Sequence, residues 1–312
     1  MSYLNISDYH VTRDQMENHY VDQSCQEWGV SFHWKNAVIA ESMTTEKGTV
    51  FEMIHRPKWG MACYMNGEIQ SCELDEKVYH QAFVDPLMAH SKNPRRVMII
   101  GGGEGAMARE VLKWPHVECV VMYEWDREVV ECFKASYRQW ANGAWEDPRL
   151  EIHYDDIFKV VVPGNYPVIP YDVILIDLFE PDGHPEIWSL FSRLASNWLS
   201  ERGVIGMYAG IRDPFTDIHP AEEWLSDHRI QKYQEEGMGI NYILSNRNVY
   251  SYKVFIPSFF GEAMFLCLVP SDVEPNWKSL NPQSSHVHSD TWKAYHTWNH
   301  YREGAAGVFH EV

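Results

Sequence analysis

The residues in this chain best placed to do chemistry lie at the ends of short apolar runs. In Arg95–Glu128, one such run meets glycines at 101, 102, 103 and 105, a helical pattern follows, and a second run ends on Glu124. This order, a strand, a glycine turn, a helix, a second strand and a carboxylate, is typical of a nucleoside-binding βαβ unit. Glycine lets backbone approach a ligand closely, and a terminal carboxylate can accept both ribose hydroxyls. The alternative is a tight turn beside a merely solvated Glu124.

Two further predicted strands end at acids in the same way. Asp155 and Asp156 follow the run 150–153, and Asp177 ends the apolar run 171–178. Ligands of parallel sheets bind outside the carboxyl ends of the strands, so these acids are expected at one site. Asp156 would accept from an adenine amino group, and Asp177 would lie beside the reacting atom. The alternative for Asp156 is a helix N-cap.

The elements that must position these residues alternate along the chain. Predicted helices at 129–140 and 187–200 alternate with predicted strands at 150–153, 171–178 and 203–208. This alternation predicts a parallel sheet with both faces covered. The runs 249–256 and 262–269 predict a late hairpin added to the sheet.

The residues before this α/β region have a different pattern. Residues 1–45 show no clear period, whereas 48–72 contain short alternating runs with Asn66 and Gly67 at a hairpin turn. A helix is expected over 75–90. We therefore predict an N-terminal β domain at 1–74 and a catalytic α/β domain at 75–312.

Composition restricts the class of protein and of partner. With 312 residues, 45% of them hydrophobic and 22% charged, the chain is typical of a globular protein. The net charge of −18 favours a small cationic partner over nucleic acid or an acidic membrane surface. We expect no membrane span, no signal peptide and no metal site, and the six scattered cysteines indicate a reducing, cytoplasmic setting.

Several motifs together resemble the polyamine aminopropyltransferases, the spermidine, spermine and thermospermine synthases. They are NGEIQ, DEKVYH, GGGEG and YDVILIDLFEP, and the resemblance extends over roughly residues 48–270. It implies a Rossmann-like, methyltransferase-type domain preceded by a small antiparallel β domain, assembled as a homodimer or homotetramer. It also implies aminopropyl transfer from decarboxylated S-adenosylmethionine to a diamine or polyamine, with methylthioadenosine released. The donor is a co-substrate, and no further cofactor is implied.

The resemblance implies a role for each matching position. Asp177 would be the catalytic base, Tyr79 would orient the attacking amine, and Gln70 would contact that amine. Glu104 would hold the aminopropyl ammonium of the donor and repel the carboxylate of intact S-adenosylmethionine. The remaining donor contacts would be Gly101, Gly103, Gly105, Glu124, Asp156, Ile157 and His80.

Three positions depart from the family pattern. Glu180 replaces a shorter acid, Glu52 replaces a donor-contacting glutamine, and Phe259 replaces a tyrosine on the acceptor side. The strand segment MYAGIRDP also lacks the usual glutamine. Two alternatives therefore stay open: a methyl- or carboxyaminopropyl transferase that uses the intact donor, and an inert polyamine-binding homologue.

Overall fold

A computed structural model describes residues 19–25, 29–181, 184–212, 247–277 and 286–296. The chain forms two compact units, Met1–Lys77 with Pro257–Phe260 and Val78–Ile256 with Gly261–Val312. Within the described ranges, no helix is both long and apolar enough to cross a membrane. The helices are α1 (Glu76–His90), α2 (Ala106–Leu112), α3 (Arg127–Ser136), α4 (Ile157–Val160), α5 (Pro185–Asn197) and α9 (Ser289–Tyr295), with short 3-10 turns η3 (Ala144–Glu146) and η4 (Pro257–Phe259).

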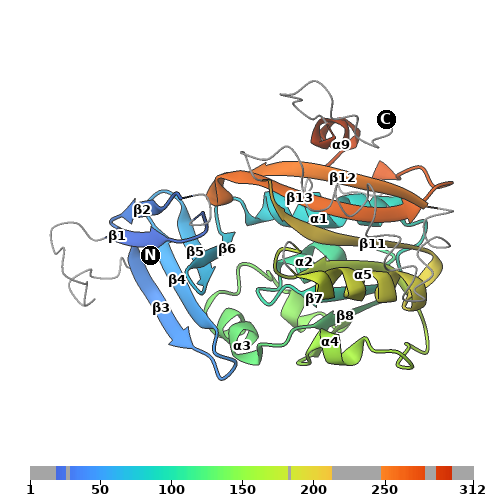
Figure 1. The fold of residues 1–312 in the computed structure, drawn as a ribbon, viewed down its shortest axis with the longest axis horizontal. Helices are drawn as coiled ribbons and strands as arrows, with labels where there is room; N and C mark the ends of the chain where they lie inside the picture. Colours follow the sequence, from blue (N-terminus) through green and yellow to red (C-terminus); the bar gives the residue numbers. More distant parts are fainter. Residues whose placement is uncertain (1–18, 26–28, 182–183, 213–246, 278–285, 297–312) are drawn as a thin grey trace. The chain divides into compact units, whose positions relative to one another are not determined.

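The first unit is built from antiparallel strands (Figure 1). Asn66 (φ 52°) and Gly67 (φ 85°) form the tight turn between β5 and β6, as the sequence predicted. The small antiparallel sheet is thereby confirmed. It has four strands in sequential order, β3 (Val38–Thr44), β4 (Val50–Arg56), β5 (Gly60–Met65) and β6 (Glu68–Cys72), whereas β1 (His19–Asp22) pairs with β2 (Phe32–Lys35) in a separate two-stranded sheet.

Three of these strands lie in the segment whose sequence showed no clear period. Strands β2 and β3 alternate only between part-buried and exposed residues, so they lack the strong apolar alternation that would reveal them. Within the same unit, Asp75 accepts hydrogen bonds from the Ser258 backbone N–H at 2.6 Å and hydroxyl at 2.8 Å. These bonds hold η4 against the residue that precedes α1.

The second unit contains a seven-stranded mixed sheet in the order β12-β13-β11-β10-β7-β8-β9. The five strands from β11 to β9 are mutually parallel, and β13 and β12 continue the sheet as an antiparallel hairpin. The predicted fold class and late hairpin are confirmed. The strands are β7 (Arg96–Gly101), β8 (Cys119–Tyr123), β9 (Leu150–His153), β10 (Tyr171–Asp177), β11 (Leu199–Ile211), β12 (Arg247–Ile256) and β13 (Gly261–Pro270).

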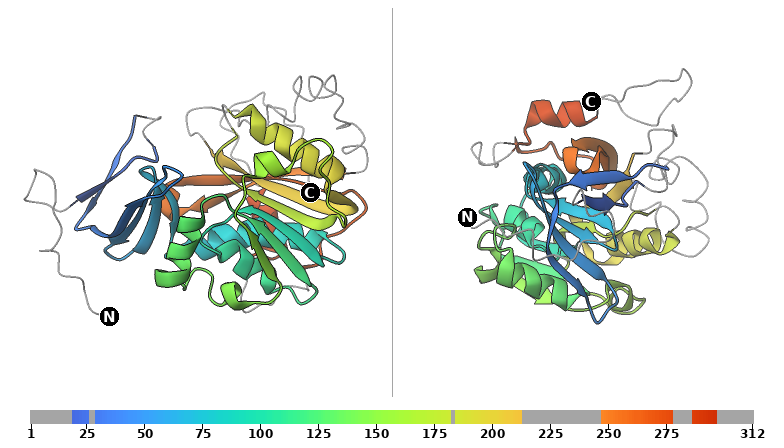
Figure 2. Two further views of the ribbon diagram at one scale, coloured as in Figure 1. Left: turned by 90° about the horizontal axis from the view of Figure 1, so that it is seen from below. Right: turned by 90° about the vertical axis from the view of Figure 1, so that its left-hand side faces the viewer.

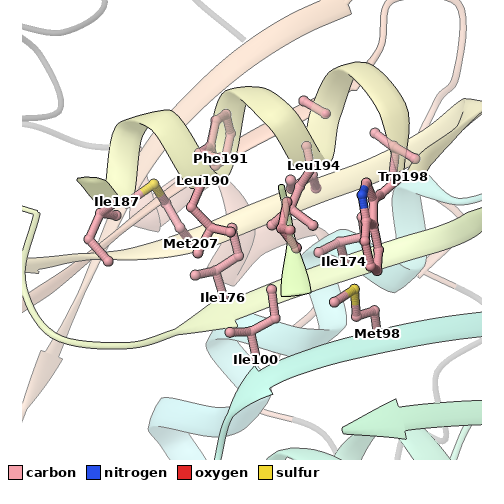
Figure 3. Close-up of a cluster of buried hydrophobic side chains, with 14 of the residues drawn as sticks. Met98, Ile100, Ile174, Ile176, Ile187, Leu190, Phe191, Leu194, Trp198 and Met207 are labelled. Carbon is pink, nitrogen blue, oxygen red and sulfur yellow. The ribbon is translucent and has the colours of Figure 1, made fainter. Parts of the chain in front are cut away.

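Helices cover both faces of this sheet (Figures 1 and 2). On one face, Leu190 and Phe191 of α5 and Ile176 of β10 belong to one cluster of buried hydrophobic side chains between the helix and the sheet (Figure 3). On the opposite face, Phe83 of α1 stacks on Phe265 of β13 with ring centroids 4.9 Å apart. Burial on both faces is what the near-continuous apolar strands require, and it fixes the carboxyl ends of the strands as one rigid edge.

Three predicted boundaries were wrong. The helix expected over 187–200 is α5, Pro185–Asn197, and residues 199 and 200 instead begin β11. The helix expected over 129–140 is α3, which ends at Ser136, although Trp140 beyond it is fully buried in a turn. Burial of Trp140 continues the helical spacing of apolar residues without requiring a helical backbone. The strand expected over 203–208 is the longer β11, Leu199–Ile211, because it pairs with β10 on one side and β13 on the other.

Gly101, where β7 ends, has an essential steric role. Its φ is +86°, and a Cβ at this position would lie 2.0 Å from the Asp177 carbonyl oxygen. We expect Gly101→Ala to lower the free energy of unfolding by about 3 kcal/mol or more, through the clash and the left-handed backbone. Gly164→Ala is the control, because φ there is +87° but nothing lies within 4 Å, so it should lose only about 1–2 kcal/mol. Urea unfolding measures both, and equal losses would contradict the steric role.

Candidate functional site

The glycine turn and three of the predicted acids lie at one edge of the second unit. Strands β10, β7, β8 and β9 are successive neighbours, and their carboxyl ends carry Asp177, the glycine turn, Glu124 and Asp156 respectively. Asp177 pairs with Gly101 in the β10–β7 ladder, which sets the acid level with the turn. This edge of the sheet is therefore acidic. It is also the edge, at the carboxyl ends of the parallel strands, where a nucleoside ligand is expected.

Two consecutive residues of α1 contact two of the acids at this edge. The Tyr79 hydroxyl donates to Asp177 Oδ1 at 2.7 Å, and His80 Nε2 lies 2.9 Å from Glu104 Oε1. Tyr79 is 7% exposed and His80 is 1% exposed, so both side chains are held by the helix packing around them. Successive side chains on a helix point in different directions, which lets one turn of α1 reach both β10 and the glycine turn.

Burial makes Asp177 a stronger base than an ordinary carboxylate. It raises the pKa of Asp177 to about 6, and the negative charge of Glu104 adds to this shift, while His80 and the Tyr79 hydrogen bond oppose it. Burial and the nearby Asp177 also raise the pKa of Tyr79 well above its ordinary value, so Tyr79 remains a hydrogen-bond donor. Near neutral pH, Asp177 is therefore mostly ionised yet able to take a proton.

Glu124 lies directly over the glycine turn. A Cβ on Gly103 would lie 3.2 Å from Glu124 Oε2, so glycine leaves the space beside this carboxylate open. The Asp126 backbone N–H donates to Glu124 Oε1 at 3.0 Å and orients it. Burial, with a further contribution from Glu104, raises the pKa of Glu124 to about 7. Such a carboxyl suits a neutral diol better than a second anion.

Asp156 has the alternative role that the sequence left open. It is the N-cap of α4, accepting from the Phe158 backbone N–H at 3.1 Å, and its other oxygen lies 3.0 Å from Lys159 Nζ. Ile157 follows it as a buried residue. The N-cap fixes the carboxylate at the strand edge, and its contact with adenine stays a prediction.

Glu180 and Tyr208 form a second contact beside Asp177. Glu180 Oε1 accepts from the Tyr208 hydroxyl at 3.2 Å and from the Ile211 backbone N–H at 2.9 Å. No sequence motif pointed to Tyr208, whose segment differs from the family pattern by lacking a glutamine. Its position could have indicated it, because a tyrosine near the carboxyl end of a predicted parallel strand can place its hydroxyl at the ligand-binding edge.

The other predicted contacts, Glu52, Gln70 and Phe259, belong to the first unit. There Glu52 Oε2 accepts from the Tyr20 hydroxyl at 2.7 Å, and Phe259 packs on the cluster around Tyr64. Gln70 is exposed, and its amide donates to the Glu68 carbonyl at 3.3 Å. The site described here is built from the second unit alone.

One set of side chains in the described residues also has the ligand types of a metal site. Ligand atoms of His80, Glu104 and Asp177 all lie within 4.8 Å of one another. The sequence offered no sign of this set, because its members come from a helix, a turn and a strand end rather than from closely spaced histidines. Two carboxylates held this close together favour a cation nearby.

Several known proteins are similar to this chain in sequence. The spermine/spermidine synthase domain model matches residues 76–268. The polyamine aminopropyltransferase of Pyrobaculum calidifontis is 34% identical over 229 residues, which are 69% of this chain and 74% of that protein. That of Aeropyrum pernix is 33% identical over 217 residues, 68% and 63% of the two chains, and polyamine aminopropyltransferase 1 of Hyperthermus butylicus is 38% identical over 156 residues, 49% and 53%. The chain therefore spans 53% to 74% of these three relatives.

Solved structures share the fold. A spermidine synthase from Thermotoga maritima superposes with a TM-score of 0.68 at 22% identity, over 93% of this chain and 95% of that one. A spermidine synthase in complex with the transition-state analogue AdoDATO gives 0.67 at 23% identity, over 92% and 93%. Since the family model extends over residues 76–268 and the Pyrobaculum relative aligns over most of both chains, this chain belongs to the spermine/spermidine synthase family.

Proposed function

We propose that this chain transfers an aminopropyl group from decarboxylated S-adenosylmethionine to a small cationic acceptor, a diamine or polyamine, and releases methylthioadenosine. The observation that carries the proposal is the pair of contacts made by consecutive residues of α1. Tyr79 bonds Asp177 at 2.7 Å and His80 lies 2.9 Å from Glu104. Asp177 can take a proton from the attacking amine, while Glu104 can bind the ammonium group of the donor.

The chemistry asks little of the enzyme beyond alignment and one proton transfer. A sulfonium is already a good leaving group, so holding the amine in line with the carbon–sulfur bond supplies much of the rate. A polyamine nitrogen arrives protonated, and Asp177 removes one proton from it. The freed lone pair forms the new carbon–nitrogen bond, and the electrons of the breaking carbon–sulfur bond stay on sulfur in methylthioadenosine. Tyr79 keeps Asp177 oriented throughout, because its hydroxyl stays protonated.

Incubation of the enzyme with a panel of amines and each donor form tests the proposal. With the decarboxylated donor, we expect mass spectrometry to show methylthioadenosine and an equal amount of an amine extended by one aminopropyl group. Methyl or carboxyaminopropyl transfer from intact S-adenosylmethionine would replace this function with the first alternative. Donor binding without turnover of any amine would favour the inert homologue.

The pH dependence should report Asp177. A base acts when deprotonated, and burial raises its pKa to about 6, so kcat/KM should fall as pH drops below about 6. The Tyr79 hydrogen bond lowers the pKa of Asp177, so Tyr79→Phe should move this acidic limb to higher pH. Ionisation of the amine affects the wild type and the Tyr79→Phe variant alike. The difference between their pH profiles therefore reports a group of the enzyme. An unmoved limb in the variant would show that another group is titrating.

A further inference from the structure

Tyr208 lies between the carboxylate that ends β10, Asp177, and the carboxylate three residues beyond it, Glu180. Its hydroxyl donates to Glu180 Oε1 at 3.2 Å, and the Ile211 backbone N–H donates to the same oxygen at 2.9 Å. Two donors from β11 therefore fix one oxygen of Glu180. Glu180 is three residues beyond Asp177, so its position relative to the base depends on this attachment to the neighbouring strand.

The ring of Tyr208 lies beside the ring that orients the base. The Tyr208 and Tyr79 centroids are 6.0 Å apart, and Phe265 lies 6.4 Å from the first and 5.3 Å from the second. Tyr79 in turn bonds Asp177. A continuous path of contacts thus runs from Glu180 through Tyr208 and Tyr79 to Asp177.

The chemistry of this path suits a second positive charge. Tyr208 is only part-buried, and a tyrosine face attracts an ammonium group. A carboxylate held by two hydrogen bonds is already ordered, so a cation that binds it does not have to immobilise it. A free Glu180 side chain would lose rotamer entropy on binding instead.

We propose that Tyr208 is a specificity-determining positioning residue that holds Glu180 for the non-reacting ammonium of the acceptor. The proposal rests on the function proposed above and assigns to this tyrosine a task that its sequence segment did not reveal. It separates two roles along the path: Asp177 and Tyr79 act on the reacting nitrogen, and Glu180 and Tyr208 act on a distant one. Loss of the Tyr208 hydroxyl should therefore weaken acceptor binding more than it slows the chemical step.

Steady-state kinetics of Tyr208→Phe with the best diamine or polyamine of the panel tests this role. The variant keeps the ring and loses only the hydroxyl, so we expect the KM for the amine to rise about tenfold or more while kcat changes less than twofold. Methylthioadenosine affinity by calorimetry should stay within twofold of wild type. Tyr250→Phe is the matched control, since the Tyr250 hydroxyl accepts a hydrogen bond from the Asn248 amide of β12, at 3.3 Å, and not from an acid of the site.

A double variant gives a second, independent readout. Glu180→Gln removes the charge, and adding Tyr208→Phe to it should raise KM little further, because both changes disable one contact. Additive effects, an unchanged KM, or a fall in kcat as large as the fall in kcat/KM would overturn the role of Tyr208. Absence of turnover by the wild-type enzyme with every amine would instead refute the proposed function itself.

Discussion

Asp177→Asn should lower kcat by a factor of about 10² to 10⁴, the usual contribution of a positioned general base. The amide oxygen can still accept the Tyr79 hydrogen bond, which is 2.7 Å long in the native protein, so the geometry of the site should survive. What is lost is the ability to take a proton from the ammonium of the acceptor. Quantifying methylthioadenosine formation measures the loss, and calorimetry should show that methylthioadenosine still binds. A variant that keeps more than a tenth of the native rate would remove Asp177 from its assigned role.

The same variant has a built-in control for folding. Burial raises the pKa of Asp177, so the folded state holds the proton more tightly than the unfolded state does. Its contribution to stability therefore falls as pH rises from about 4 to about 6 and stays low above that range. Asp177→Asn should accordingly be more stable than wild type by about 1–3 kcal/mol at pH 7 to 8, with the difference vanishing near pH 4. A less stable variant would mean that lost activity reflects damage to the fold.

Glu104→Gln should remove the selection between the two donor forms. A hydrogen bond to a charged group contributes about 1.5–3 kcal/mol, so affinity for the decarboxylated donor should fall roughly tenfold to a hundredfold. Affinity for intact S-adenosylmethionine should rise, because its carboxylate no longer meets a negative charge. Calorimetric titration with each donor measures both changes. Unchanged discrimination would show that Glu104 does not contact the aminopropyl end.

A matched surface carboxylate serves as the control for this variant. Glu118 pairs with Arg95 beside the amino end of β8, at the opposite end of that strand from Glu124, and its side chain is 57% exposed. Glu118→Gln should leave the affinity for both donors unchanged. Comparison of the two variants separates a local contact from a general change in the charge of the protein.

The pH profile gives Glu104→Gln a second signature. The charge of Glu104 raises the pKa of Asp177, so its removal should move the acidic limb of kcat/KM to lower pH. Tyr79→Phe is expected to move the same limb the other way. Opposite shifts from two neighbours of one carboxylate are hard to explain unless that carboxylate is the titrating group.

Glu104 also bears on the proposed binding of a cationic donor. Its charge contributes to the raised pKa of both Asp177 and Glu124. Three partly buried carboxyl groups close to one another destabilise one another when all are ionised, and the sulfonium and ammonium groups of the proposed donor would offset that repulsion. Part of the donor's binding free energy would therefore come from relief of the repulsion among these carboxylates.

The sequence by itself determined the order of the elements and the acids at the strand ends. The run into Gly101, the run into Glu124 and the run into Asp177 each carry local signals, because apolar periodicity and glycine chemistry act over a few residues. The rule that ligands bind at the carboxyl ends of parallel strands then joined these distant acids into one expected site. The resemblance to a known family added the roles of α1, which no local pattern could have assigned.

Only the tertiary structure decided which side chains contact each other at that edge. Tyr79 and Asp177 are 98 residues apart, and Glu180 and Tyr208 are 28 apart on different elements. Such contacts depend on strand order, register and rotamers, which the hydrophobic pattern of a single segment does not encode. The raised pKa of Asp177 likewise arises from burial and from Glu104, 73 residues away in the sequence, brought close by the β7–β10 pairing. The acids at the strand ends could therefore be predicted from the sequence, whereas the contacts between residues distant in the sequence required the tertiary structure.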